Sequence, residues 1–200
     1  MINNKKVFVI DEGKSEEIVL ILHGYPTSTF DYYKVLLELT KKYRVILHDH
    51  LGFGFSDKPK NFSYSLINQA DIALQLWEQL GVKNATLLAH DYGTSVATEI
   101  IARHNTNEID LQIDKLILCN GSMHIELSKL RTIQKLLKGP FGKYAARLTN
   151  YAIFSKNLRN VYFDKTKITK EELQQMWQQI EYNKGKKVIH LISDYINQRY

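Results

Sequence analysis

The sequence predicts an α/β protein, with a mostly parallel sheet covered by helices on both faces and a helical unit after it. Short apolar runs rich in β-branched residues alternate with helix-like segments up to residue 121. From residue 122 onward, strand-like runs are absent and apolar residues recur at helical spacing, as at Leu173, Met176, Trp177 and Ile180. We therefore predict a sheet-containing part at residues 1–121 and a helical unit at residues 122–200.

The first half of the sheet part is predicted to contain three strands and one helix. Val7 to Ile10 and Ile18 to Leu22 are short β-branched runs, and Tyr43 to His48 has the pattern of a buried strand. A helix-like segment runs from Thr27 to Lys42, between the second and third strands.

The second half repeats this alternation. A helix is predicted from about Tyr64 to Leu80, and Gly81 ends it. The apolar run from Asn84 to Ala89 predicts a strand that passes abruptly into a helical stretch, Thr94 to His104. Lys115 to Cys119 predicts one further strand, and strands that alternate with helices in this way form parallel sheets.

The composition is typical of a globular protein. The 200 residues are 44% hydrophobic and 24% charged, with 3 Pro and a single cysteine, which excludes disordered, collagen-like and disulfide-rich classes. The longest apolar run, Ile18 to Leu22, is far shorter than the roughly 20 residues that cross a bilayer, and we recognise no secretory signal. Cys119 lies in an apolar strand pattern without a possible intramolecular disulfide partner, which favours a reducing compartment. The predicted location is the cytoplasm, with no membrane-spanning segment.

The charge is unevenly distributed along the chain. The net charge is +6, but residues 1–126 carry −4 and residues 127–200 carry +10. Such asymmetry fits two structural units, or a basic surface that faces nucleic acid or anionic lipid. The simpler alternative is a solvated, lysine-rich helical surface. Because no nucleic-acid-binding motif is present, we favour that alternative and expect no nucleic-acid partner.

The segment Leu87 to Gly93 has the pattern of a nucleophile elbow, in which a strand turns sharply into a helix. The small residues Ala89 and Gly93 flank the turn, where larger side chains would clash with the neighbouring backbone. Asp91 occupies the central position, with His90 before it and Tyr92 after it. The alternative is that Asp91 is an ordinary N-cap residue of the helix that follows.

An aspartate at this position implies a particular chemistry. A carboxylate is already an anion at neutral pH, so it needs no base before it attacks. Its natural target is a carbon that carries a leaving group, as in an epoxide or an alkyl halide. The product would be an alkyl ester on Asp91, which water activated by a general base must then cleave. The expected substrate is a small apolar organic molecule with an electrophilic carbon.

Two further segments support this interpretation. His23-Gly24-Tyr25-Pro26 follows a predicted strand, where a backbone amide is available to a developing negative charge; the second donor would be the amide of Tyr92. The segment Asp49 to Pro59 follows the next strand and matches a dinucleotide fingerprint poorly, since it lacks the third glycine and opens no helix. It predicts a structured loop beside the site.

These three segments, in this order, resemble the α/β-hydrolase fold in its epoxide hydrolase and haloalkane dehalogenase branch. The resemblance runs from about Leu22 to Arg199 and extends to the mesoderm-specific transcript protein group, through residues 52–59, 90–93 and 195–199. It implies that Asp91 is the nucleophile, that Tyr25 and Tyr92 supply the oxyanion-hole amides, and that residues 122–200 form a helical cap.

Two departures from the dehalogenase pattern favour epoxide chemistry. Dehalogenases of this branch have Trp after the nucleophile and commonly Asn in the first loop, whereas this chain has Tyr92 and Tyr25. In epoxide hydrolases cap tyrosines polarise the epoxide oxygen. The candidates here are Tyr144, Tyr151, Tyr162 and Tyr182.

The resemblance also implies two more strands after the cap, which carry a catalytic acid and the histidine that activates water. The chain stops at Tyr200, so we expect a fold truncated before those strands and an impaired second half-reaction. His124, His190 and Glu126 are poor substitutes. The alternatives are an inactive scaffold with a binding role, or half of a split enzyme that a C-terminal complement chain completes. No metal-ligand spacing is found, and this chemistry needs no cofactor.

Overall fold

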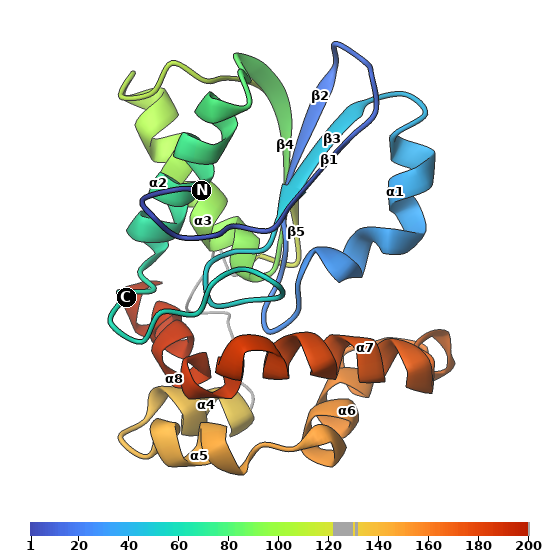
Figure 1. Cartoon of the computed structure of the whole chain (residues 1–200), viewed down its shortest axis with the longest axis vertical. Coiled ribbons are helices and arrows are strands. Elements are labelled where there is room, and N and C mark those ends of the chain that lie inside the picture. Colours follow the sequence, from blue (N-terminus) through green and yellow to red (C-terminus); the bar gives the residue numbers. More distant parts are fainter. Residues whose placement is uncertain (122–129, 131, 200) are drawn as a thin grey trace.

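The computed structural model describes residues 1–121, 130 and 132–199. Its sheet has five strands in the order β1-β3-β2-β4-β5 (Figure 1). β1 is antiparallel to β3, and all other neighbouring strands are parallel. The strands are β1 (Val9–Glu12), β2 (Ile18–Leu22), β3 (Arg44–His48), β4 (Asn84–His90) and β5 (Gln112–Cys119).

The register brings the carboxyl ends of four strands to one edge of the sheet. Leu22 at the end of β2 lies beside His48 of β3 and Ala89 of β4, and His90 lies beside Cys119 of β5. The loops that follow these strands therefore meet at this edge, which is where open α/β sheets place their ligands.

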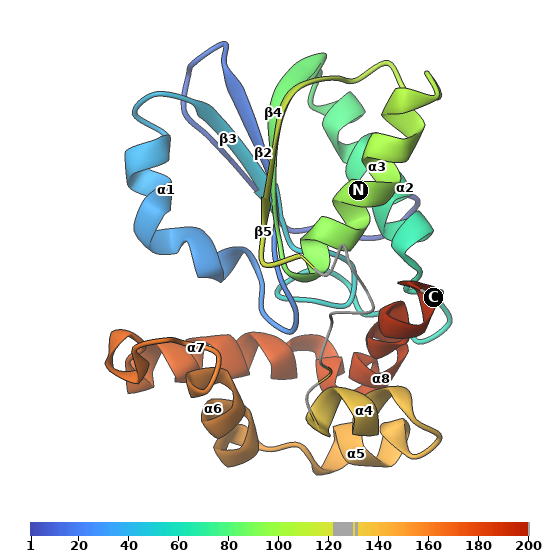
Figure 2. The same ribbon diagram turned by 180° about the vertical axis from the view of Figure 1, so that it is seen from behind.

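Helices cover both faces of the sheet, as Figures 1 and 2 show from opposite sides. One face packs on α1 (Tyr33–Leu39), which a 3-10 turn, η1 (Thr29–Tyr32), precedes. The other face packs on α2 (Leu66–Gln79) and α3 (Tyr92–Asn105). Successive strand residues point to opposite faces: Val19 and Ile21 belong to the first core, whereas Leu20 and Leu22 belong to the second.

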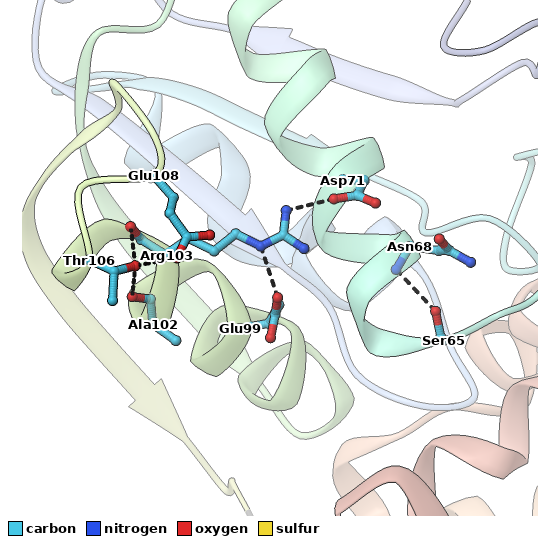
Figure 3. A network of polar contacts seen from close by, with 8 residues as sticks. All are labelled: Ser65, Asn68, Asp71, Glu99, Ala102, Arg103, Thr106 and Glu108. Atoms are coloured by element: carbon cyan, nitrogen blue, oxygen red, sulfur yellow. Dashed lines mark hydrogen bonds and ion pairs between the residues drawn. The ribbon is translucent and has the colours of Figure 1, made fainter.

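An ion-pair network joins α2 and α3 at the surface (Figure 3). Nη1 of Arg103 on α3 lies 2.6 Å from Oδ1 of Asp71 on α2, and its Nε lies 2.8 Å from Oε1 of Glu99 one helical turn earlier. Ser65 caps α2 by accepting the backbone N–H of Asn68. These contacts fix α3 against α2, and α3 begins directly after Asp91.

The remaining helices form a layer next to the carboxyl ends of the strands (Figure 1). Buried apolar side chains of this layer form a core of their own around Phe154, Leu173 and Trp177. In the final turns, Ile189 packs against this core, whereas Val188, Ile192 and Tyr195 pack into the core of the sheet part. The layer comprises α4 (Thr132–Lys138), α5 (Gly142–Leu148), α6 (Tyr151–Arg159), η3 (Lys165–Lys167), α7 (Lys170–Glu181), η4 (Tyr182–Lys187), α8 (Ile189–Ile192) and η5 (Ser193–Arg199).

The five predicted strands are confirmed, with ends that differ by up to three residues. The helix predicted from Thr27 to Lys42 is wrong in its first third, because Thr29–Tyr32 is a 3-10 turn and the α-helix covers only Tyr33–Leu39. The hydroxyl of Ser28 accepts the N–H of Phe30 and so starts the chain in the tighter turn. The first ten positions of the predicted helical unit lie outside the described residues, except Leu130.

Strand β5 forms an edge of the sheet, and most of its residues are exposed. Leu116, Ile117 and Leu118 keep between 37% and 44% of their surface accessible. None of the described helices has both the length and the apolar character needed to cross a bilayer.

Candidate active site

Asp91 lies on a sharp turn between β4 and α3. Its backbone angles, φ 48° and ψ −112°, are rare for a residue other than glycine and mark a locally strained turn. Small neighbours make the turn possible: a Cβ on Gly93 would lie 2.4 Å from the carbonyl oxygen of Leu22, and one on Gly24 would lie 3.0 Å from the Cβ of Asp91. The sequence pattern of small flanking residues thus corresponds to close backbone contacts.

Two backbone amides converge on one oxygen of the Asp91 carboxylate. Oδ1 accepts the N–H of Tyr25 at 2.8 Å and the N–H of Tyr92 at 2.7 Å. An ordinary N-cap side chain accepts the amide of the second or third helical residue. Here the carboxylate accepts the first helical amide and an amide from a separate loop. The arrangement therefore differs from ordinary helix capping.

The loop of His23, Gly24, Tyr25 and Pro26 is held in place by His23. The Nε2 of His23 accepts the backbone N–H of His50 at 3.0 Å, so the proton lies on Nδ1, which donates to the carbonyl of Gly24 at 2.8 Å. Burial lowers the pKa of His23, and the neutral ring fits both bonds. The peptide bond between Tyr25 and Pro26 is cis. His23 thus shapes the loop that presents the Tyr25 amide.

The loop after β3 is ordered by the buried carboxylate of Asp49. Its two oxygens accept the N–H groups of Thr29 and Phe55, at 2.8 and 2.7 Å. Gly54 has φ 46°, and a Cβ there would lie 1.9 Å from Oδ2 of Asp49. The ammonium group of Lys58 donates to the carbonyl of Gly54. The loop is therefore a rigid structure beside the site, as predicted.

Aromatic side chains connect this loop, the turn at Asp91 and the helical layer. The ring of Tyr92 is buried and lies 5.2 Å from Phe53 and 4.9 Å from Tyr195. The hydroxyl of Tyr25 lies 3.0 Å from Oγ of Ser193, the first residue of η5. Burial raises the pKa of the Tyr25 phenol, so this group stays neutral. Among the described residues, the hydroxyl of Tyr25 has Ser193 as its polar partner, and no feature of the sequence predicts that pairing.

An apolar cleft lies between the helical layer and the loops. Its lining residues are Tyr25, Pro26, Gly52, Phe53, Gly54, Ile180, Gly185, Ile189 and Ile192. Asp91 is not among them, although the expected position of the nucleophile is in front of a pocket under the helices. Tyr25 connects the cleft with the turn at Asp91, because it lines the cleft and its backbone N–H donates to the Asp91 carboxylate.

A second carboxyl group, Asp31, lies near Asp91 and was not singled out from the sequence. Burial raises its pKa to about 7, the hydroxyl of Thr27 opposes that shift by donating to it, and the charges of Asp91 and Asp49 add to the rise. The only sequence feature that could have indicated this carboxyl group is the spacing of four residues between Thr27 and Asp31. This spacing is common at the starts of helices, so it does not distinguish a functional residue.

The described histidines do not pair with Asp91. His48 and His50 are fully buried, and burial lowers the pKa of His48 to about 3. Nε2 of His90 lies 3.4 Å from the amide nitrogen of Asn120. Partial burial and the charges of Lys143 and Arg147 lower the pKa of His190. Two other candidates, His124 and Glu126, lie outside the described residues.

The four candidate tyrosines are placed differently. Tyr144 and Tyr182 keep 61% and 47% of their surface exposed. Tyr151 donates to the carbonyl of Lys170. Tyr162 is partly buried, and burial together with the negative charge of Asp31 raises its pKa. Of the four, Tyr162 is therefore the one with an electrostatic link to the carboxyl groups near Asp91.

The geometry leaves no described metal centre: within residues 1–121, 130 and 132–199, no group of three or more His, Cys, Asp or Glu side chains is placed to hold an ion.

The chain belongs to the α/β-hydrolase fold family, whose model matches residues 17–188. The mesoderm-specific transcript protein of Mus musculus is 44% identical over 191 residues, covering 92% of this chain and 57% of that protein. Epoxide hydrolase 1 of Caenorhabditis elegans is 32% identical over 117 residues, covering 58% of this chain and 28% of that protein. This chain thus spans little more than half the length of the mouse relative.

Solved structures agree on the fold. The haloalkane dehalogenase DbeA from Bradyrhizobium elkani superposes with a TM-score of 0.80 at 21% identity, over 98% of this chain and 67% of that one. The predicted fold and the resemblance to mesoderm-specific transcript proteins are confirmed.

Proposed function

We propose that Asp91 is a nucleophile that attacks an electrophilic carbon of a small apolar molecule and forms an alkyl ester. The observation that carries this proposal is the convergence of the Tyr25 and Tyr92 amides on Oδ1. With Oδ1 held, Oδ2 is the oxygen that reacts. When water later cleaves the ester, negative charge forms on the held oxygen, and the same two amides stabilise it.

An epoxide is the proposed electrophile, ahead of an alkyl halide. The hydroxyl of Tyr25 is engaged by Ser193, so it is not free to hold a departing halide. The C. elegans relative is named an epoxide hydrolase, which supports the same substrate class.

The ester-cleaving step is proposed to be slow in this chain. Among the described residues, no histidine is hydrogen-bonded to the Asp91 carboxylate, so a general base for water is missing there. Loss of a general base typically lowers the rate about 10²- to 10⁴-fold. The chain should therefore accumulate the alkyl ester.

The test is intact-mass measurement after incubation with styrene oxide, with 1-bromohexane in a parallel sample. We expect one adduct per chain, mapped to Asp91 by peptide sequencing, with faster labelling by the epoxide. Asp91→Asn should remove the adduct, whereas the exposed control Asp110→Asn should retain it. A folded chain that remains unlabelled would refute the nucleophile, and sustained turnover would refute the slow second step.

A second candidate is a split enzyme whose complement chain supplies the base. The exposed apolar edge of β5 and the partial coverage of the mouse relative favour it. Epoxide turnover would then rise when a separately expressed C-terminal segment of that relative is added. A binding scaffold without chemistry is the remaining alternative, and it predicts neither adduct nor rescue.

A further inference from the structure

One stretch of the sequence after the sheet part contains no acidic residues. Residues 127–163 contain eight Lys or Arg and no Asp or Glu. This stretch includes α4, α5 and α6. Among the ion pairs of the described residues, none involves Lys135, Lys143 or Arg147, which are all exposed. Partial burial lowers the pKa of His190, and the positive charges of Lys143 and Arg147 lower it further.

Large apolar side chains are exposed on the same helices. In α4, α5 and the turn between them, Leu136 is 49% exposed, Phe141 69%, Tyr144 61% and Leu148 75%. Single exposed apolar residues are normal, but a group of them on one helix pair marks an interaction surface. We call Lys135, Leu136, Phe141, Lys143, Tyr144, Arg147 and Leu148 the α4–α5 surface.

The inner side of the helix pair is packed, so this exposure belongs to a distinct outer side. Leu137 and Ala146 are buried, and α5 contacts α8 and η4. Gly142 allows the tight turn, since a Cβ there would lie 1.9 Å from the carbonyl of Leu137. That close approach holds Phe141 at the tip. Figures 1 and 2 both place α5 on the side of the helical layer that faces away from the sheet.

We propose that the α4–α5 surface binds membranes that contain anionic lipids. Phe141, Tyr144 and Leu148 would enter the headgroup region, while Lys143 and Arg147 contact lipid phosphates. Basic helices with exposed aromatic and aliphatic side chains lie in the membrane interface in this manner. Nucleic acid, the other polyanion, would contact the basic groups but offers no apolar layer for Phe141 and Leu148. The proposal is independent of the chemistry at Asp91.

The experiment is vesicle co-sedimentation of the full chain. One set of vesicles contains phosphatidylcholine alone, and the other contains phosphatidylglycerol as about one third of the lipid. We expect binding to the anionic vesicles, with at least about tenfold weaker binding to the neutral ones and a loss at high salt.

Paired variants separate the two contributions. Two double variants should each weaken binding about tenfold. One reverses basic charges, Lys143→Glu with Arg147→Glu, and the other removes apolar side chains, Phe141→Ser with Leu148→Ser. The matched controls are Lys42→Glu with Lys60→Glu, and Val35→Ser with Leu37→Ser, which change exposed residues of the sheet part. These controls should bind within about twofold of the unmodified chain. Circular dichroism verifies that each variant is folded.

Three results with vesicles would overturn the proposal: no binding to anionic vesicles, equal weakening by the control pairs, or binding that the Phe141 and Leu148 changes leave intact. Single-stranded RNA serves as a polyanion control. Tighter binding to that RNA than to anionic vesicles, unaffected by the apolar variants, would assign the surface to nucleic acid instead.

Discussion

At the residue scale, the site depends on backbone segments that approach one another too closely for a side chain. Gly93 is the clearest case, because Leu22 of the neighbouring strand occupies the space where a Cβ would be. The sequence pattern indicated this need correctly, since Ala89 and Gly93 flank the central residue. Small flanking residues are a local requirement, and local requirements can be read from neighbouring positions.

Gly93→Ala should lower the free energy of unfolding by about 2 kcal/mol, because the backbone must shift to accommodate the methyl group. Gly81→Ala is the matched control. Gly81 also has a positive φ, 72°, but no atom lies within 4 Å of its Cβ position. Gly81→Ala should therefore lower the free energy of unfolding only through backbone strain, by about 1 kcal/mol. Urea unfolding measures both, and equal losses would contradict the steric argument.

Asp31→Asn should change how stability depends on pH. The folded-state pKa of Asp31 is about 7, above its ordinary value of 3.8, so the folded chain holds a proton that the unfolded chain has released. The contribution of Asp31 to stability is therefore present at low pH and is lost as pH rises from about 4 to about 7. Asparagine stays neutral and keeps an acceptor for Thr27. The unfolding temperature, measured across this pH range, should fall less with rising pH in the variant than in the unmodified chain. An equal fall in the two proteins would contradict this prediction.

Other parts of the site could not be predicted at this scale. The bond between the Tyr25 hydroxyl and Ser193 joins positions separated by 168 residues. The proximity of Asp31 to Asp91 depends on how η1 packs against the elbow. A serine at position 193 and an aspartate at position 31 are ordinary residue types for those positions. Such contacts arise from tertiary packing, which leaves no periodic or local trace in one sequence.

At the element scale, short apolar runs predicted all five strands, but they did not indicate whether neighbouring strands are parallel or antiparallel. β1 pairs with β3 antiparallel, although the alternation of strands and helices favours parallel pairing. Apolar residues at helical spacing predicted a helical unit at residues 122–200, and its described part consists of several separate helices. Asn183 and Lys184, with φ of 49° and 60°, break the chain between α7 and α8. Left-handed conformations at Lys are set by packing and cannot be inferred from residue type.

Thr169→Ala should lower stability by about 1 kcal/mol, because α7 begins with a reciprocal capping box. The hydroxyl of Thr169 accepts the N–H of Glu172, whose carboxylate accepts the N–H of Thr169. Thr169→Ser retains the hydroxyl and should lose much less. Urea unfolding with hydrogen exchange at the first turn of α7 measures the difference. Equal losses in the two variants would argue against a role for the cap.

At the scale of the whole molecule, the sheet ends in an apolar edge. β5 has one hydrogen-bonded neighbour, β4, and exposes Leu116, Ile117 and Leu118. Unpaired strand edges are sites of association between chains.

The chain should therefore self-associate as its concentration rises, and Ile117→Lys should reduce that association. A charge on an edge strand opposes pairing with another strand. Ile67→Lys, at an exposed position of α2, is the matched control and should leave association unchanged. Sedimentation velocity over a concentration series measures the effect. A chain that stays monomeric at all concentrations would contradict this expectation.

The position of Tyr25 has a consequence for engineering. Its backbone N–H donates to the Asp91 carboxylate, while its hydroxyl is hydrogen-bonded to Ser193, the first residue of η5. The layer is therefore not an interchangeable cover. A chimera that replaces it with the corresponding segment of another protein of this fold would need a hydroxyl at the position of Ser193 to keep this hydrogen bond.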